Sequence, residues 1–308
     1  MKKVLPFLLV ISFLLTFTGC KKDSSEIDLS NLDEKTLQTQ YLEKPAYQRP
    51  KSQDPMDNIF IALNVLKNAS YYESESIGEV SAKKGITLAT QKVKNRRIIT
   101  PAAAFNESIS VSSFIKVAEQ LYITKDAILK REANKVSSDT NIKWKDTVDS
   151  LTNEEYLEQY GYSFKDPTRY IINEKTFIND IEIVNNGLGR KYTYKFKLEP
   201  LIASYYYKTS VKELSNSSTD PTFKSIEITM TFDYKWRMSE ITTNEIYEVT
   251  ISPLGKVTCY ASLTETFKNI EKHTTINESS FFEKQLQKWY WHTRYIYINY
   301  SINIKLIN

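Results

Sequence analysis

Ile226-Glu227-Ile228-Thr229-Met230-Thr231-Phe232-Asp233-Tyr234-Lys235-Trp236 is the stretch that decides the fold class of this chain. Apolar side chains occupy every second position and polar ones the positions between, which is the pattern of a strand with one buried face. At about 3.3 Å per residue the stretch would span roughly 35 Å, longer than the usual strand. A strand of this length favours a large, curved antiparallel sheet over a compact sandwich.

The sequence on both sides of this stretch predicts further antiparallel strands. Residues 241–251 and 257–267 continue it around a Ser252-Pro253-Leu254-Gly255 turn, and residues 177–184 and 192–198 flank a hairpin signal at residues 185–189. Upstream, residues 72–82 and 86–99 alternate weakly. Residues 109–123 alternate clearly on one parity, and 127–132 supply a return strand. Each half of the chain therefore reads as a meander.

Three helices interrupt the strands. Asp54-Pro55 starts the first, whose apolar face recurs at three- and four-residue spacing up to about Ser70. Thr152 and Glu155 form a capping box for a short helix over 151–160, which ends at Gly161. The third is expected from Pro200 to Leu214. The predicted fold class is α+β: a half-barrel-like antiparallel meander with a few helices packed on its concave face.

The first twenty residues resemble the signal peptide of a bacterial lipoprotein. Met1-Lys2-Lys3 is a short basic region, residues 4–17 are almost entirely apolar, and Phe17-Thr18-Gly19-Cys20 resembles a lipobox, although Phe17 departs from the aliphatic residue usual there. The resemblance implies cleavage after Gly19 and a covalent diacylglycerol on Cys20. The protein would then be anchored by lipid on the extracytoplasmic face of the cell membrane, and no other cofactor is expected.

The expected domain organisation follows from these signals. Residues 1–19 are a signal peptide, 20–53 a flexible polar tether, 54–270 a single α+β domain and 271–308 a C-terminal extension. The end of the extension alternates again, from Trp289 to Asn308, and three readings stay open for it. It is a final edge strand, a segment at the membrane surface, or the product of reading an AT-rich gene past its natural end.

The order of elements from Asp54 to Phe267 is similar to that of the half-barrel lipid-carrier folds, which include periplasmic lipoprotein carriers and mycobacterial envelope lipoproteins. In those families a curved sheet wraps a helical plug, and acyl chains lie between the two. The similarity implies a lipid-like ligand. It rests on element order, so it carries over no ligand-binding residues.

Composition excludes several function classes. The formal charge is +4, and without Lys2 and Lys3 the chain keeps 39 basic against 37 acidic side chains, too even a balance to favour nucleic acid as a partner. Two cysteines are present, so with Cys20 acylated Cys259 has no partner and is expected as a small buried strand residue. His273 and His292 have no metal-binding spacing, and no catalytic motif occurs.

Three residues are candidates for ligand binding. Glu265 has the parity of the apolar positions in residues 257–267, so it either points inward toward a ligand head group or lies at the sheet rim, which we favour. Tyr205 and Tyr206, next to Tyr207, suggest stacking against a sugar or lipid, although packing of two rings with one exposed is the commoner outcome.

The function expected from the sequence is that of a non-enzymatic envelope lipoprotein that binds a hydrophobic or amphiphilic ligand. The alternative is an interaction module that holds an envelope protein or a cell-wall glycan through exposed aromatic side chains. An enzyme stands third, with Asp, Glu or Tyr groups brought together by folding.

Overall fold

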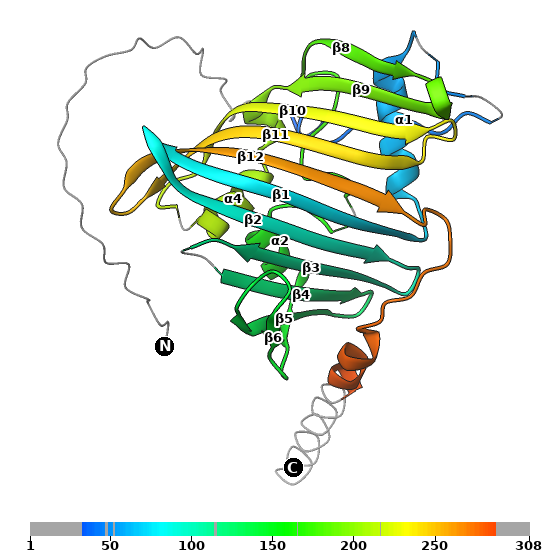
Figure 1. Cartoon of the computed structure of the whole chain (residues 1–308). Helices are drawn as coiled ribbons and strands as arrows, with labels where there is room; N and C mark the ends of the chain where they lie inside the picture. Colours follow the sequence, from blue (N-terminus) through cyan, green and yellow to red (C-terminus); the bar gives the residue numbers. More distant parts are fainter. Residues whose placement is uncertain are drawn as a thin grey trace, which may run out of the picture. The chain divides into compact units, whose positions relative to one another are not determined.

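The computed structural model describes residues 33–46, 49–51, 53–113, 116–164, 166–215 and 217–287, all within one compact unit, Leu32–Asn308. Cys20, Gly19 and residues 289–308 lie outside this part of the chain. The described fold is α+β, as the sequence predicts: a curved, unclosed antiparallel sheet with a few helices (Figure 1). No helix in the described ranges is long and apolar enough to cross a membrane.

Twelve strands form the sheet, and every pairing is antiparallel. The order across it is β6-β5-β4-β3-β2-β1-β12-β11-β10-β9-β8, with β7 paired to β5 off this path. The strands are β1 (Tyr72–Lys84), β2 (Ile86–Ile99), β3 (Ala103–Val111), β4 (Lys116–Thr124), β5 (Ile128–Val136), β6 (Ile142–Trp144), β7 (Asp149–Leu151), β8 (Phe177–Asn186), β9 (Lys191–Leu198), β10 (Thr222–Asp233), β11 (Met238–Ile251) and β12 (Gly255–Lys268).

Two meanders make up the sheet, and they meet at its middle. Strands β1 to β6 follow one another in space, and so do β8 to β12. The join is the pairing of the first strand with the last, which runs from Glu73 opposite Lys268 to Lys83 opposite Thr258 (Figure 1). The meander predicted in each half of the chain is confirmed, and the strand over residues 257–267 lies in the centre of the sheet.

Helix α1 (Pro55–Lys67) fills the concave side of the second meander. Ile59, Phe60 and Leu63 are fully buried against inward side chains of β9 to β11. The helix begins at the expected proline, but the Asp54 side chain caps no backbone N–H. Burying this apolar surface is the main favourable term in folding, so α1 and the second meander form the principal core.

Residues 33–46 pack on this core, which differs from the tether expected up to Gln53. The Gln40 N–H donates to the Ile172 carbonyl at 2.8 Å, and the Asn173 amide donates to the carbonyls of Thr36 and Gln38. Thr36 is buried in these contacts. The folded unit therefore starts before α1, because the Asn173 amide and the Ile172 carbonyl satisfy backbone groups of a segment that has no periodicity of its own.

Helix α2 (Asn153–Tyr160) has the predicted capping box. The Glu155 N–H donates to Thr152 Oγ1 at 3.1 Å, the Thr152 N–H donates to Glu155 Oε2 at 2.7 Å, and Gly161 adopts a left-handed φ of 80°. The helix predicted from Pro200 to Leu214 is instead broken into α3 (Pro200–Ala203) and α4 (Tyr207–Ser215). The break includes Tyr205 and Tyr206, whose rings make an edge contact with each other.

One further expectation is corrected in the first meander, and the extension, whose structure the sequence leaves open, contributes an element of its own. The single parity over residues 109–123 continues through a hairpin, so one predicted strand is two, β3 and β4. The extension contributes a helix over 279–287, whose fully buried Phe282 stacks on Tyr122. It packs with Ile98 and Phe105, which have the opposite parity to the inward Arg97, so this helix covers the outer face.

Candidate ligand-binding cavity

A cavity of about 680 Å³ lies under the first meander and the join. Inward residues of β1 to β5, β11 and β12 form one wall, and α2, residues 162–170 and α4 form the other. Figure 1 shows α2 and α4 on the same side of the sheet as α1. Small-molecule pockets commonly measure 300–1,000 Å³, so this cavity has the size of a binding site.

One charged pair stands at the centre of the strand wall. Arg97 of β2 and Glu265 of β12 flank β1, and Arg97 Nη2 lies 3.5 Å from Glu265 Oε1. Ser74 of β1 donates its hydroxyl to the same oxygen at 2.6 Å. Burial lowers the pKa of Arg97, but the neighbouring Tyr72 and Glu265 outweigh burial and raise it overall. The guanidinium therefore stays charged inside the cavity.

A second charged pair joins the two walls. Arg169, from the segment between α2 and β8, places Nη2 3.6 Å from Oε1 of Glu245 on β11. The Arg169 guanidinium also lies 4.5 Å from the ring centroid of Tyr207 on α4, a cation–π distance. The Glu245 side chain is only 2% exposed. Burial raises the pKa of its carboxyl, and Arg169 offsets this in part.

Glu245 Oε1 lacks a hydrogen-bond partner. Among the described residues, it and Glu278 Oε2 are the only buried side-chain oxygen or nitrogen atoms in this condition. Its distance from Arg169 gives charge attraction without a hydrogen bond. An unsatisfied buried acceptor costs about 1–3 kcal/mol, more when it is charged, so this oxygen calls for a functional explanation.

Apolar side chains line the cavity beside the two charged pairs. Ile99, Ala104 and Ile123 are aligned across β2, β3 and β4, and Ala104 and Ile123 pack with Tyr156 of α2. Leu121 lies in the next row, opposite Asn106. The cavity is therefore amphiphilic, with an apolar wall adjoining a polar centre.

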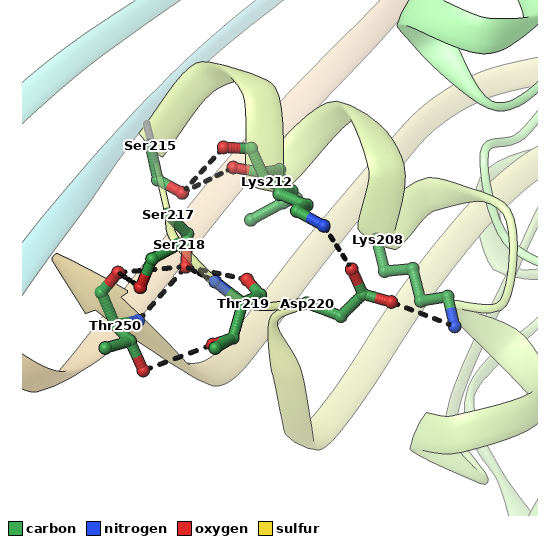
Figure 2. Close-up of polar contacts among 9 residues, drawn as sticks. Lys208, Lys212, Ser215, Ser217, Ser218, Thr219, Asp220 and Thr250 are labelled. Carbon is green, nitrogen blue, oxygen red and sulfur yellow. Dashed lines mark hydrogen bonds and ion pairs between the residues drawn. The ribbon is translucent and has the colours of Figure 1, made fainter.

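Helix α4 is held over the cavity from its C-terminal side (Figure 2). Asp220 binds Lys212 at 2.8 Å and Lys208 at 3.6 Å, so one carboxylate holds two turns of the helix. Ser217 Oγ accepts the Thr250 N–H at 3.1 Å, which attaches the following loop to the end of β11. These contacts fix the spacing between α4 and the sheet.

The three residues proposed from the sequence have different outcomes. Glu265 lies three residues before the end of β12, but it is paired with strands on both sides and lines the cavity, so the preference for a rim position was wrong. Tyr205 and Tyr206 do not line it; Tyr206 is exposed, and their neighbour Tyr207 lines the cavity instead. Cys259 is a buried free cysteine, as predicted, and burial raises its thiol pKa to about 11.

Sequence reasoning missed Arg97, Arg169 and Glu245. A usable signal was present in residues 72–82 and 86–99, where alternation is weak because polar side chains occupy inward positions as well as outward ones. Polar residues on the inner face of a sheet indicate a wet or hollow interior rather than a filled core. Within the described ranges, no group of His, Cys, Asp and Glu side chains is arranged to hold a metal ion.

Comparison with known proteins does not indicate a function, so the function is argued from the cavity. No protein-family model and no curated protein matches the chain. A similar solved structure is the crystal structure of a DUF1329 family protein from Desulfovibrio piger, at 10% sequence identity and a TM-score of 0.25. The match covers 74% of this chain and 96% of that one, and at this TM-score it carries no argument.

Proposed function

We propose that this protein is a non-enzymatic, lipid-anchored envelope protein that binds an amphiphilic ligand in the cavity. The observation that carries the proposal is the cavity itself, in which an apolar wall adjoins two partly buried charged pairs. An acyl or other apolar chain would lie along Ile99, Ala104 and Ile123, and its polar end would lie at the charged pairs. Pockets that combine these two surfaces fix orientation with the polar groups and affinity with the apolar ones.

The anchor is the part of the proposal that rests on sequence. Replacement of Cys20 by Ser removes the only thiol available in the lipobox-like segment. We expect the Cys20→Ser chain to lose incorporated radiolabelled palmitate and to leave the membrane fraction. A variant that keeps both the label and the membrane association would contradict the anchor without affecting the cavity.

The cavity is tested by filling it in the full-length Cys20→Ser chain. Asn95 lines the cavity from β2, whereas Lys94, its neighbour, points to the outer face and is exposed. Titration with the apolar fluorophore N-phenyl-1-naphthylamine should show at least tenfold weaker binding for Asn95→Trp and unchanged binding for Lys94→Trp. A second variant, Ser76→Leu, fills the cavity from a different strand, so weaker binding in both variants cannot be explained by misfolding around Asn95 alone. Equal binding by all four chains would overturn the proposal.

The alternative function, an interaction surface of exposed aromatics, has less support. Of the aromatic side chains that the structure describes, only Tyr206 and Tyr260 are exposed by more than a third. Tyr260 has the opposite parity to the inward Cys259 and therefore lies on the outer face of the sheet, whereas Tyr206 lies between helices α3 and α4. They do not form one patch.

Catalysis by paired carboxylates is also disfavoured. Glu245 and Glu265 each face an arginine. Glu245 pairs with Ala261, four residues from Glu265 along β12, so the two backbone positions are about 14 Å apart at ~3.4 Å per residue. An arginine beside each carboxylate favours the charged form of both groups over a proton shared between them. The two carboxylates therefore fit polar binding better than shared proton transfer.

A further inference from the structure

We propose that the cavity selects amphiphiles whose head group is uncharged and carries hydroxyls, and that Glu245 and Arg169 bind this head group. This inference deepens the proposed function and rests on it. It concerns which amphiphile binds, whereas the preceding proposal requires only that one does.

The first argument is the open acceptor. Glu245 is held on β11 with its side chain toward the cavity, and Oε1 has no hydrogen-bond partner. By contrast, Glu265 Oε1 already accepts the Ser74 hydroxyl at 2.6 Å and faces Arg97. The two carboxylates are thus unequal, and Glu245 has the unused capacity to accept a hydrogen bond from a ligand.

The second argument is charge. The polar centre holds two guanidinium groups and two carboxylates, arranged as two opposite-charge pairs. The other lining carboxylates that are not exposed are also paired, each within 4.0 Å of a lysine: Glu119, Glu132 and Asp166. A phosphate, carboxylate or quaternary ammonium head group would add a net charge that no remaining side chain of these pairs compensates. Burying an uncompensated charge is expensive, whereas a neutral polyol leaves both pairs balanced.

The third argument is the spacing of the second pair. Arg169 Nη2 offers donors and Glu245 Oε1 offers an acceptor, 3.6 Å apart. One hydroxyl oxygen can lie about 2.8 Å from both atoms, donating to the carboxylate and accepting from the guanidinium. Oε1 is covered by its neighbours, so a small shift of the Arg169 side chain must admit the hydroxyl while the guanidinium stays within hydrogen-bond reach. This side chain is 23% exposed and lies outside any helix or strand. An ammonium head group would meet Arg169 as a like charge.

The experiment uses five compounds that share an unbranched twelve-carbon chain and differ in the head group. Monolaurin carries two hydroxyls, lauric acid and dodecyl phosphate are anionic, dodecyltrimethylammonium is cationic, and methyl laurate is neutral without a donor. Each is used below its critical micelle concentration, or for methyl laurate below its solubility limit, to displace N-phenyl-1-naphthylamine from the Cys20→Ser chain. We expect monolaurin to bind at least tenfold more tightly than the other four.

Two variants then test whether Glu245 is the cause of the preference for monolaurin. Glu245→Gln should reduce the advantage of monolaurin over methyl laurate to threefold or less while leaving methyl laurate binding unchanged. The control is Glu240→Gln, a carboxylate on the outer face of the same strand, which should keep the full preference. Thermal melting of both variants identifies a misfolded chain, in which case the probe series on the parent chain decides alone.

The outcomes separate the two proposals. Displacement by none of the five compounds would overturn the proposed function. Displacement by all five with equal affinity would leave the proposed function standing and overturn the head-group inference. Preference for an anionic or cationic probe, or an undiminished monolaurin preference in Glu245→Gln, would also overturn the inference.

Discussion

The inner face of this sheet has two halves with the same antiparallel strand geometry, but one half is filled by a packed core and the other encloses a cavity. Under β9 and β10, inward positions carry large apolar side chains such as Ile228 and Phe232, and these are completely buried in the core that α1 fills. Under β1 and β2, inward positions carry Ser76, Asn95 and Arg97, and the helices there leave a cavity. The comparison teaches that strand register alone fixes which face is inside, while side-chain polarity decides whether the inside is filled.

The largest loss of stability is expected when a large side chain is removed from the packed core of the filled half. Phe60→Ala removes a fully buried ring of α1 and should lower the free energy of unfolding by about 3–5 kcal/mol. Asn95→Ala, on the cavity wall, should lower it by about 1 kcal/mol or less, because no packed core surrounds that side chain. Urea unfolding of the two Cys20→Ser chains measures both values, and similar losses would break the distinction between the halves.

The join between the halves provides the next test. Gly78 of β1 faces Leu263 of β12, and a Cβ at Gly78 would lie 2.4 Å from the Ser262 carbonyl oxygen and 2.9 Å from Leu263 Cα. Because both contacts are backbone, the strands must move apart, and Gly78→Ala should cost about 1–3 kcal/mol. Ser76→Ala, two residues away on the same strand, serves as the control and should change the melting temperature little. An unchanged melting temperature for Gly78→Ala would show that the join tolerates separation.

A smaller loss of stability is expected from a change in helix α2, which forms part of the cavity wall. Thr152→Ala removes one hydrogen bond of the capping box of α2 and should lower stability by about 1 kcal/mol. Glu158→Ala, exposed on the same helix, should have no such effect. Since α2 contributes Tyr156 to the cavity wall, ligand binding should weaken in parallel with stability. Calorimetry and fluorophore titration of the same samples would reveal whether the two losses are linked.

The smallest effect concerns the attachment of α4. The hydrogen bond from Lys212 lowers the pKa of Asp220 below its usual 3.8, although the Asp220 side chain is 56% exposed. A carboxyl with a lowered folded-state pKa contributes stability above its unfolded pKa and loses it as the pH falls through the lowered value. Asp220→Asn should therefore cost about 0.2–1 kcal/mol at pH 7, and the two chains should converge near pH 2. A constant difference from pH 7 to pH 2 would rule out this ionic contribution.

Local sequence signals predicted the elements wherever they decide the geometry by themselves. The capping box at Thr152, the hairpin at residues 185–189 and the turn before Gly255 each fix a boundary through nearby hydrogen bonds or backbone conformation. Alternation of apolar residues did not reveal every strand end. The apolar positions keep the same odd numbering in β3 and in β4, so the sequence pattern does not show where one strand stops and the next begins. Trp236 extends the alternation of β10, but the strand ends at Asp233, and the indole N–H of Trp236 donates to Asn58 of α1.

The cavity could not be predicted because its parts come from distant positions. Arg169 belongs to a segment without periodicity, and nothing near it in sequence indicates that it meets Glu245. Residues 33–46 fall within the tether predicted over 20–53 for the same reason, since the amide of Asn173 that binds their backbone lies far downstream. In both cases the tertiary contact, not the local pattern, determines the role of the residue.

The pairing of the first strand with the last has a consequence for the order of events during synthesis. Ser74 and Glu265, which touch at this join, are 191 residues apart, whereas nearly every other strand pair is close in sequence. Each meander can form soon after its strands leave the ribosome. The free edge of β1, however, stays unpaired until β12 has been synthesised, because contacts between residues distant in sequence form late. We therefore expect chains truncated before Gly255 to be far more protease-sensitive than the complete chain, and to acquire no binding site until β12 docks.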